Sequence, residues 1–393
     1  MRSVPSDAIP LSRFAQRSAY RVESSTLDVE RWAFLLPFMR TEQTIPFPLG
    51  VARVLSLADL QNVREWERAF AGKSKDHRFY EIVEQTLESQ FEHRYLLLED
   101  QTGRVRAIQP LFFVQQNLVE GIPALRSVVN AIRRRFPRFL TMRVLMVGNA
   151  AGEGHLSACS PEDEDWVANA LLATLKTYAK QSKASLVVFK DFAARYRHAL
   201  RNFSAQGYAR VPSMPMTELQ LRYTDFAHYL STLGASTRKD LRRKFRRTAA
   251  APPIDLEVVA DLSPYVDEVY PFYLQVHERS PLKFERLTKE YLRNLGRRMP
   301  ERARFFIWRQ DGKAIAFSVA LVHDGVIYDD YLGLDYSVAL DLHLYFYTLR
   351  DILSWSIAQG LERYRSSPLN YHPKLHLGCD LLPLDLYVMH TAA

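Results

Sequence analysis

"RFFIWRQDGKAIAFSVALVH", residues 304–323, is the stretch that decides the fold. Two apolar runs flank the polar pair Asp311-Gly312, a pattern typical of a β-hairpin with a two-residue turn. The same pattern occurs in "RYLLLEDQTGRVRAIQPLFFV" (94–114), where a polar Thr-Gly pair lies between the apolar runs. The two hairpins begin about 210 residues apart. A hairpin of this kind at two places predicts a repeated structural unit.

The segments around each hairpin repeat as well. A stretch with helical periodicity precedes each hairpin, and a second such stretch, a strand, an excursion and a last alternating strand follow it. In the second half the two helical stretches are 284–299 and 340–360, and the two strands are "LERYRSS" and 382–388. In the first half the second helical stretch is 163–181, and the two strands are 184–191 and 216–223. We therefore predict an α+β fold with two mixed, mostly antiparallel sheets flanked by helices.

The length of 393 residues also favours two domains, because single cores stop growing at smaller sizes. We place the first domain at 51–230 and the second at 251–393, joined by an arginine-rich helix at 231–250. Residues 1–50 hold prolines at positions 5, 10, 37, 46 and 48, and we expect them to form an irregular lead-in.

The composition is that of a globular protein, with 47% hydrophobic and 24% charged residues. No apolar run reaches the roughly 18 residues that a membrane-spanning helix needs. The first residues lack a basic segment followed by an apolar one, so we expect no secretory leader. Two cysteines do not make a disulfide framework and fit a reducing compartment, so we expect a cytoplasmic protein.

The basic charge is concentrated in "RKDLRRKFRR" (238–247), where seven basic residues and one acid supply +6 of the net +8. Leu241 and Phe245 form a narrow apolar seam, so this helix should lie on a surface and expose its arginines. Three interpretations remain open: a solvated face, a phosphate site, for which the planar guanidinium is well suited, and nucleic-acid binding. Because the helix joins the two halves, we expect its ligand at their interface. A smaller cluster comprises Arg133, Arg134, Arg135 and Arg138.

Candidate catalytic residues gather in the second half. In "YDDYLGLD" (328–335), Asp329 and Asp330 face opposite sides of a strand, so that one meets solvent while the other points to a cleft. Burial would raise the pKa of that carboxyl toward neutrality, as a general base requires, although a solvated strand end is the alternative. The polar segment "RYRSSPLNYHPKLHLG" (363–378) follows a strand, where sites are often built, or is an ordinary surface loop.

Other kinds of chemistry find less support. His372, His376 and Cys379 have a spacing that suggests zinc, but Pro373 and Gly378 disfavour a regular helix and no fourth ligand lies nearby. We therefore expect no metal. Nothing near Cys159 marks it as an activated nucleophile, and no nucleophile elbow, P-loop or dinucleotide-binding fingerprint occurs.

Taken together, several segments resemble the acyl-CoA N-acyltransferase (GNAT) superfamily, in particular its tandem FemAB-like or BioF2-like acetyltransferase branch, also described as "peptidoglycan biosynthesis/recognition". They are "GNAAGEGH", "VVFKDF", "STRKDLRRKFRR", "LKFERLT", "YDDYLGLDY", "LHLYFYTLRDILSW", "SSPLNYHPKLHLG" and "PLDLYV". The resemblance spans roughly 50–390 and implies two acetyltransferase-like domains that face each other across a cleft. One departure concerns the glycine-rich loop with which members hold the pyrophosphate of acyl-CoA: the corresponding "YSVALDLHL" (336–344) has no glycine.

This resemblance implies an N-acyltransferase that moves an acyl group from acyl-CoA or an acyl carrier protein to a small-molecule amine. We assign Asp330 as the base and Tyr371 as the acid that protonates the leaving group. Substrate contacts are assigned to Glu285, Tyr331, Asp335, Arg365, Asn370, Lys374 and His376, and donor phosphates to Arg238, Arg242, Arg243 and Arg246. The alternatives are a Fem-type ligase that uses aminoacyl-tRNA, and a non-catalytic protein that binds nucleic acid or cell-wall fragments.

Overall fold

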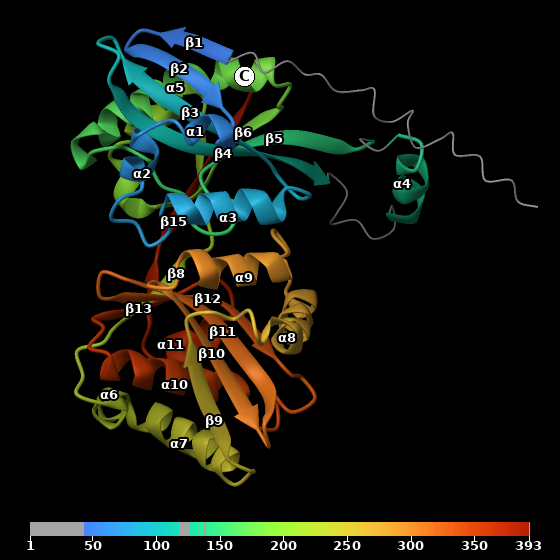
Figure 1. Ribbon diagram of the computed structural model, residues 1–393, viewed down its shortest axis with the longest axis vertical. Coiled ribbons are helices and arrows are strands. Elements are labelled where there is room, and N and C mark those ends of the chain that lie inside the picture. Colours follow the sequence, from blue (N-terminus) through green and yellow to red (C-terminus); the bar gives the residue numbers. More distant parts are fainter. Residues whose placement is uncertain (1–42, 118–125, 137–138, 393) are drawn as a thin grey trace, which may run out of the picture. The chain divides into compact units, whose positions relative to one another are not determined.

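The computed structural model describes residues 43–117, 126–136 and 139–392, and the predicted lead-in lies almost wholly outside them. Within these residues two sheets flanked by helices confirm the predicted α+β fold (Figure 1). The helices are α1 (Leu57–Leu60), α2 (Glu65–Ala69), α3 (His77–Leu87), α4 (Arg126–Arg133), α5 (Glu164–Gln181), α6 (Phe226–Thr232), α7 (Ala235–Ala249), α8 (Val266–Arg279), α9 (Lys289–Arg298), α10 (Leu344–Ala358) and α11 (Tyr371–His376).

The first sheet has the order β1-β2-β3-β4-β5-β6-β15-β7. Its strands are β1 (Gln43–Phe47), β2 (Gly50–Leu55), β3 (Glu92–Asp100), β4 (Val105–Asn117), β5 (Thr141–Val147), β6 (Leu186–Ala193), β7 (Ala209–Pro212) and β15 (Leu384–His390). The hairpin β3–β4 is the one predicted at 94–114, and β5 pairs with β6 in parallel after the crossover through α5. Residues 43–47, expected to be irregular, are strand β1.

The second sheet has the order β14-β8-β13-β12-β11-β10-β9. Its strands are β8 (Met216–Gln220), β9 (Ile254–Val259), β10 (Ala303–Gln310), β11 (Lys313–His323), β12 (Val326–Leu334), β13 (Arg363–Ser366) and β14 (Asp380–Leu382). Asp311 and Gly312 both have positive φ, as the predicted two-residue hairpin turn requires. The second sheet again runs from a hairpin to a strand, a helix and a parallel strand, namely β10–β11, β12, α10 and β13. The repeat predicted from the sequence is therefore present.

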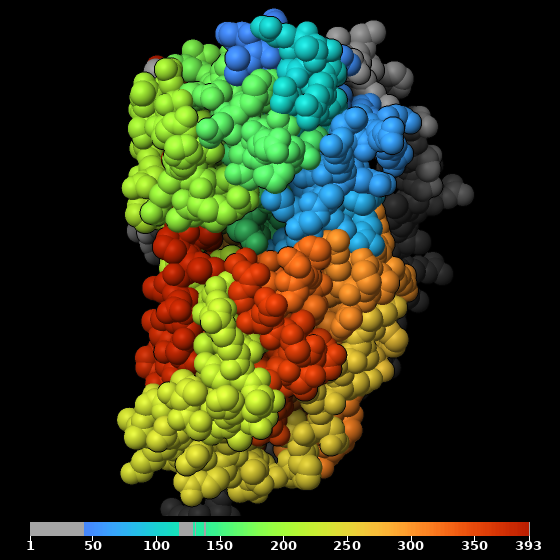
Figure 2. Space-filling model, turned by 90° about the vertical axis from the view of Figure 1, so that its left-hand side faces the viewer, coloured from blue at the N-terminus to red at the C-terminus, as the bar shows by residue number. Residues whose placement is uncertain are grey.

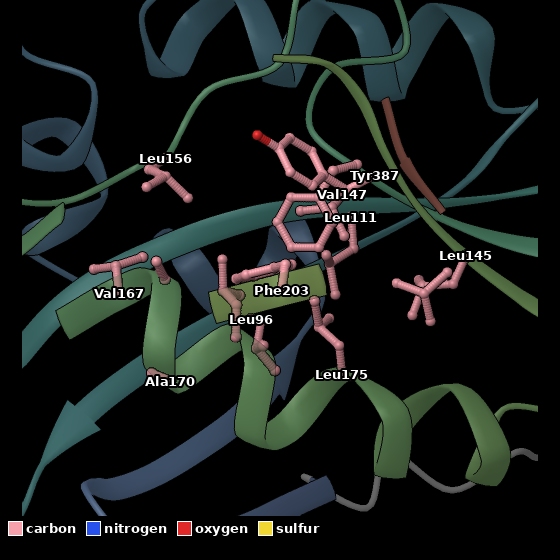
Figure 3. Close-up of a cluster of buried hydrophobic side chains, with 14 of the residues drawn as sticks. Leu96, Leu111, Leu145, Val147, Leu156, Val167, Ala170, Leu175, Phe203 and Tyr387 are labelled. Carbon is pink, nitrogen blue, oxygen red and sulfur yellow. The ribbon is translucent and has the colours of Figure 1, made fainter. Parts of the chain in front are cut away.

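The two sheets exchange their last strands. Strand β8 comes from the first half of the sequence but lies between β13 and β14 of the second sheet, and Figure 2 shows this yellow-green segment running between red ones. Strand β15 comes from the end of the chain but lies between β6 and β7 of the first sheet. Its Tyr387 is 3% exposed and belongs to the same buried cluster as Leu96, Leu111 and Val147 (Figure 3). Consequently, the boundaries 51–230 and 251–393 do not separate the two sheets.

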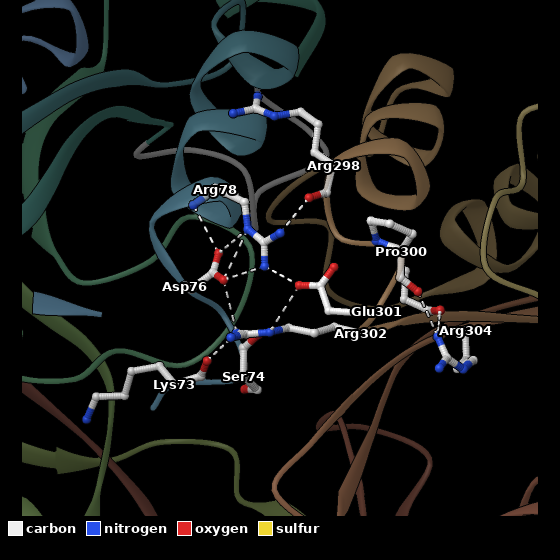
Figure 4. Close-up of polar contacts among 10 residues, drawn as sticks. Lys73, Ser74, Asp76, Arg78, Arg298, Pro300, Glu301, Arg302 and Arg304 are labelled. Atoms are coloured by element: carbon white, nitrogen blue, oxygen red, sulfur yellow. Dashed lines mark hydrogen bonds and ion pairs between the residues drawn. The ribbon is translucent and has the colours of Figure 1, made fainter. Parts of the chain in front are cut away.

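The halves also share a hydrophobic core and a polar network. Helix α3 packs against α9, and buried residues of both helices belong to one cluster. Beside this core, Arg78 donates to Asp76, to Glu301 and, at 2.8 Å, to the carbonyl oxygen of Arg298 (Figure 4). Arg302 donates to the carbonyl oxygens of Lys73 and Ser74, at 2.6 and 3.1 Å, and lies 3.2 Å from Asp76. The segment before α3 is therefore held by residues that follow α9.

Candidate active site

Asp330 lies at a β-bulge in β12. Ala320 of β11 pairs with Asp329 and Val319 pairs with Tyr331, so Asp330 has no partner in the register. A bulge of this kind changes the direction of a side chain, and bulges are common next to active sites. The Asp330 side chain is only 11% exposed, which differs from the expectation that one of the two aspartates meets solvent.

The first half of the chain supplies the groups around Asp330. The Nζ atom of Lys75, just before α3, lies 3.2 Å from Oδ2 of Asp330 and 3.3 Å from Oε2 of Glu153. Burial raises the pKa of Asp330 to about 6, although Lys75 opposes this shift. Burial alone would lower the pKa of Lys75, but the two carboxylates raise it. Burial disfavours the charged form of Glu153 too, yet the charge of Lys75 lowers its pKa to about 2.

Asp329 faces a different environment. Its carboxylate is buried and accepts hydrogen bonds from Ser318 and, at 2.8 Å, from the Tyr364 hydroxyl. Burial raises the pKa of Asp329, and the two hydroxyl donors oppose the shift. Because its acceptors are occupied by neighbours in the same sheet, Asp329 holds the strands β11, β12 and β13 together. Asp330 is the aspartate of this pair that contacts the other half.

Glu285 and Tyr331 lie together, as their shared assignment to the substrate requires. The Tyr331 hydroxyl donates to Oε1 of Glu285 at 2.7 Å. The Tyr331 ring contacts those of Tyr273 and Tyr291, with centroids 6.3 and 6.4 Å apart. Glu285 follows Phe284, whose ring lies under Nζ of Lys190 at 5.0 Å. These residues form an acidic and aromatic patch beside Asp330.

The polar residues of 363–378 have partners within the protein. Lys374 is 3% exposed and donates to the carbonyl oxygens of Ser367 and Leu369, so it fastens the loop before α11. Burial lowers the pKa of Lys374 to about 8. Arg365 donates to Glu218 at 2.6 Å. In place of the expected substrate contact, Lys374 therefore has a structural contact.

The remaining predicted residues of this segment also point to protein neighbours. The Tyr371 hydroxyl donates to the carbonyl oxygen of Pro215 at 2.8 Å, and burial raises its pKa. Asn370 precedes α11 in a left-handed conformation and hydrogen-bonds Tyr345. His376 lies 3.3 Å from Asp240 of α7 and stacks on His372. Among the residues that the structure describes, no three His, Cys, Asp or Glu side chains are grouped as a metal site would require.

The loop 336–344, where the resemblance led us to expect a donor contact, comes before α10. Asp335 accepts from the backbone and hydroxyl of Ser337, so it forms a turn at the end of β12. Backbone amides of this loop and of the first turn of α10 are used internally: Leu344 donates to Ala339, and Phe346 to His343. These two amides are therefore not free for a phosphate.

Helix α7 lies elsewhere than we predicted. Helix α6 ends at Thr232, and α7 begins at Ala235 after Leu233 and Gly234. Helix α7 packs against α10. Within the described residues, the hydrogen bonds, ion pairs and ring contacts of its side chains are with residues of 226–376. Thr248, for example, donates to the carbonyl oxygen of Leu342 at 2.6 Å. We expected α7 to lie at the interface of the two halves, and this placement is wrong. The apolar seam of α7 packs on α10, a helix that flanks the second sheet.

One face of α7 borders a surface hollow of about 710 Å³. Arg238, Arg242 and Arg246 line it, together with Lys239 and Arg350. Arg238 is engaged with the carbonyl oxygens of Ser231 and Leu233. Arg243 is on another face and pairs with Asp240 at 2.7 Å. Three of the four arginines assigned to phosphate thus share one basic concavity.

Lys75, Glu153 and Lys190 were missed by the sequence reasoning. Glu153 lies in "GNAAGEGH", and the Cβ of an alanine at Gly154 would approach the carbonyl oxygen of Lys190 to 2.3 Å, so this glycine permits a close approach of two segments. Nζ of Lys190 in turn donates to the carbonyl oxygen of Gly152 at 2.8 Å. The glycine-rich segment was the available signal for Glu153. Nothing in the sequence around Lys75 indicated that it meets Asp330.

The structure is an α+β scaffold with two related sheets, and both halves of the chain contribute to one buried carboxylate–lysine centre. Comparison with known proteins is consistent with that scaffold. Residues 235–372 match the family model for an "Acetyltransferase (GNAT) domain". No curated protein matches the chain.

Several solved structures are similar to the chain over most of its length. The structure of FemX is 10% identical, with 84% of this chain and 96% of that chain covered and a TM-score of 0.52. A tandem GNAT protein from the clavulanic acid biosynthesis pathway is 11% identical, with 86% and 98% covered and a TM-score of 0.47. The C-terminal domain of a lysylphosphatidylglycerol synthetase from Agrobacterium fabrum is 13% identical, with 76% and 84% covered and a TM-score of 0.47.

At such low identities the likeness concerns the fold, for which the FemX structure is the relevant comparison. The comparisons therefore show a match to a GNAT acetyltransferase domain at 235–372, and over most of the chain a fold like that of the FemX structure. Within the described residues, no helix combines the length and apolar character needed to cross a bilayer.

Proposed function

We propose that the protein transfers an acyl group from a thioester of coenzyme A or an acyl carrier protein to a primary amine, with Asp330 as the general base. The observation that carries this proposal is the bulged position of Asp330, nearly buried, against Lys75. A carboxyl whose pKa is about 6 is largely ionised at pH 7 and still basic enough to accept a proton in the reaction.

In this reaction the acceptor enters as an ammonium ion and loses one proton to Asp330, directly or through a water molecule. The free amine attacks the carbonyl carbon, a C–N bond forms, and the C–S bond breaks as the tetrahedral intermediate collapses. The departing sulfur takes up a proton, for which Tyr371 is our candidate donor once its hydroxyl leaves the carbonyl oxygen of Pro215. The nitrogen loses its second proton as the intermediate collapses, and this proton restores the Tyr371 hydroxyl, so that the net proton released is the one taken by Asp330. Lys75 keeps Asp330 ionised, and Glu153 limits how far Lys75 lowers the pKa.

The acceptor is an amine that meets Glu285 and Tyr331. Glu285 has no ion pair within the described residues, so its carboxylate is available to an incoming ammonium group. The Tyr331 hydroxyl donates to the same carboxylate and holds it in place. We leave Lys374 out of substrate binding, because its ammonium group is buried in contacts with carbonyl oxygens.

For the donor we propose that α7 side chains replace the missing glycine-rich loop. Two faces of α7 are available, one with Arg242 and Arg246 at the hollow and one with Arg243 and Arg247 toward Asp240 and Asp341. The double variants R242E/R246E and R243E/R247E separate them. Reversing the charges on the face that binds donor phosphate should raise the KM for acyl-CoA. Reversing the charges on the other face should leave this KM unchanged.

Aminoacyl-tRNA is the second candidate donor. The specific observation in its favour is the row of Lys239, Arg242 and Arg246 on one exposed face of α7, since a helix with cations at such spacing suits a chain of phosphates. A tRNA-dependent reaction would be abolished by RNase and would weaken steeply with salt. A thioester-dependent reaction would do neither.

The decisive experiment measures transfer by wild-type protein and by Asp330→Asn with acetyl-CoA, long-chain acyl-CoA, acylated carrier protein and aminoacyl-tRNA. We expect D330N to lose about 10²–10⁴-fold in kcat with the true donor. Asp324→Asn, in the exposed turn before β12, is the matched control and should retain activity. Full turnover by D330N would remove Asp330 as the base, and absence of transfer by wild type with all four donors would favour the non-catalytic alternative.

A further inference from the structure

Strands β4 and β5 extend beyond the rest of their sheet. The β3 strand reaches β4 only as far as the pair Glu92–Phe113, and β6 reaches β5 only as far as Val144–Leu186. Beyond these pairs, β4 and β5 continue together to the pair Asn117–Thr141. The result is a two-stranded ribbon that leaves the sheet and carries α4 at its end (Figure 1).

The ribbon ends in a cluster of exposed apolar side chains. Phe136 is 62% exposed, Phe139 38% and Leu140 39%, although residues of these types are usually buried. Arg133 holds the segment in place: its guanidinium donates to the carbonyl oxygens of Phe139 at 2.9 Å and Leu140 at 3.1 Å, and to Oδ1 of Asn117 at 2.8 Å. The exposure is therefore part of a fixed arrangement.

The charged residues described in this cluster are basic. Arg134 and Arg135 are exposed next to Phe136, and the guanidinium of Arg135 lies over the Phe136 ring at 5.8 Å. No aspartate or glutamate occurs between Glu120 and Glu153 in the sequence. Exposed phenylalanines beside unopposed arginines suit a surface that is apolar inside and negatively charged outside.

We propose that Arg134, Arg135, Phe136, Phe139 and Leu140, here called the ribbon tip, insert into the surface of an anionic lipid bilayer. The two phenylalanines and the leucine enter the boundary between head groups and acyl chains, and the arginines meet the lipid phosphates. A projecting tip favours a bilayer over a folded partner, because inserting into lipid needs no complementary groove. None of these residues contacts Asp330 or Lys75, so the ribbon tip is independent of the transfer chemistry.

Vesicle flotation tests this proposal with the full chain. Wild-type protein should float with vesicles of phosphatidylcholine and about 30% phosphatidylglycerol, and should bind pure phosphatidylcholine at least about tenfold more weakly. F136E/F139E should lose at least about tenfold in partitioning to the anionic vesicles, because charged side chains replace the inserting rings. In F136W, addition of the anionic vesicles should shift the emission of the new indole to shorter wavelength.

Matched variants make the outcome specific. V211E/L381E introduces the same charge change at two exposed apolar positions elsewhere and should partition like wild type. R242E/R246E asks whether α7, the other basic surface, carries the binding, and should also partition like wild type. All substituted positions are exposed, and circular dichroism verifies folding.

The proposal is overturned if wild type ignores anionic vesicles, or if F136E/F139E floats as wild type does. It is equally overturned if V211E/L381E or R242E/R246E loses as much binding as the ribbon-tip variant, or if the F136W emission does not move. Acyl-transfer activity on soluble substrates should be unchanged in F136E/F139E, which separates a failure here from a failure of the proposed reaction.

Discussion

Replacing Lys75 by methionine tests the central electrostatic argument. The substitution keeps most of the side chain's volume and removes its charge. The Nζ atom is 3.2 Å from Asp330 and 3.3 Å from Glu153, and the lysine side chain is 5% exposed. K75M therefore leaves two poorly hydrated carboxylates without their shared cation.

The expected magnitude follows from these distances. At an effective dielectric constant of about 20, each contact contributes about 5 kcal/mol of Coulomb attraction. Desolvation of the three ions offsets several kcal/mol per ion, and removing one partner of a buried pair is known to cost about 3–5 kcal/mol. We expect K75M to lose about 3–5 kcal/mol in the free energy of unfolding at pH 8.

The loss must depend on pH. Without Lys75, the folded-state pKa of Asp330 rises further above its unfolded value near 3.9, so ionising it destabilises the folded state increasingly as pH rises from about 4 to that folded pKa. At pH 5 most of the carboxyl is protonated, and the loss should be smaller than at pH 8 by about 1–3 kcal/mol.

Urea unfolding at pH 5 and pH 8, followed by circular dichroism, measures both quantities. Lys239→Met, on the exposed face of α7, is the control and should change stability by less than about 0.5 kcal/mol. A loss below about 1 kcal/mol at pH 8, or an equal loss at both pH values, refutes the reasoning that Lys75 is the buried counter-ion of Asp330.

Three further predictions concern activity and the joining of the halves. The transfer rate should rise with pH along a limb near 6, because only ionised Asp330 accepts a proton, and K75M should move this limb to higher pH in a pH–rate profile. R302A should cost about 2–4 kcal/mol in urea unfolding, since it removes one of the two arginines at Asp76 and leaves the carbonyl oxygens of Lys73 and Ser74 without this donor. R304A, whose guanidinium meets carbonyl oxygens of its own segment, should cost less than about 1 kcal/mol. Tyr387→Ala should cost about 3–5 kcal/mol, and hydrogen exchange should show the loss first in the first sheet, where this ring is buried.

Local patterns made much of the fold predictable. Asp311-Gly312 determines a tight turn by its backbone preferences, and alternating apolar residues on either side determine the strands, so both hairpins followed from the sequence. The sequence could not indicate the exchange of β8 and β15. Alternation shows that a segment is a strand with one buried face, but both sheets offer such a face, and the choice depends on contacts between residues far apart in the chain.

The difference between local patterns and long-range contacts also explains which residues of the candidate site could be proposed from the sequence. Asp330 could be proposed from the sequence because two adjacent aspartates in a strand face opposite sides, so that one of them can point to a cleft. Its cation could not, because Lys75 is 255 positions away along the chain and meets Asp330 only after α3 packs against α9. Lys374 was misassigned for a related reason: a lysine in a polar loop is normally solvated, and its burial depends on the carbonyl oxygens of Ser367 and Leu369.

The exchanged strands have a consequence for how the protein is made. As the chain leaves the ribosome, β1 to β7 emerge first. The first sheet still lacks the strand between β6 and β7 until β15, at 384–390, has emerged. Until then β6 and β7 expose unpaired edges and the cavity that Tyr387 fills, so the newly synthesised first half should depend on chaperones and be sensitive to proteases. Stalled or shortened chains that lack only this strand should be cleared by quality control, even though every residue of the catalytic centre is already present.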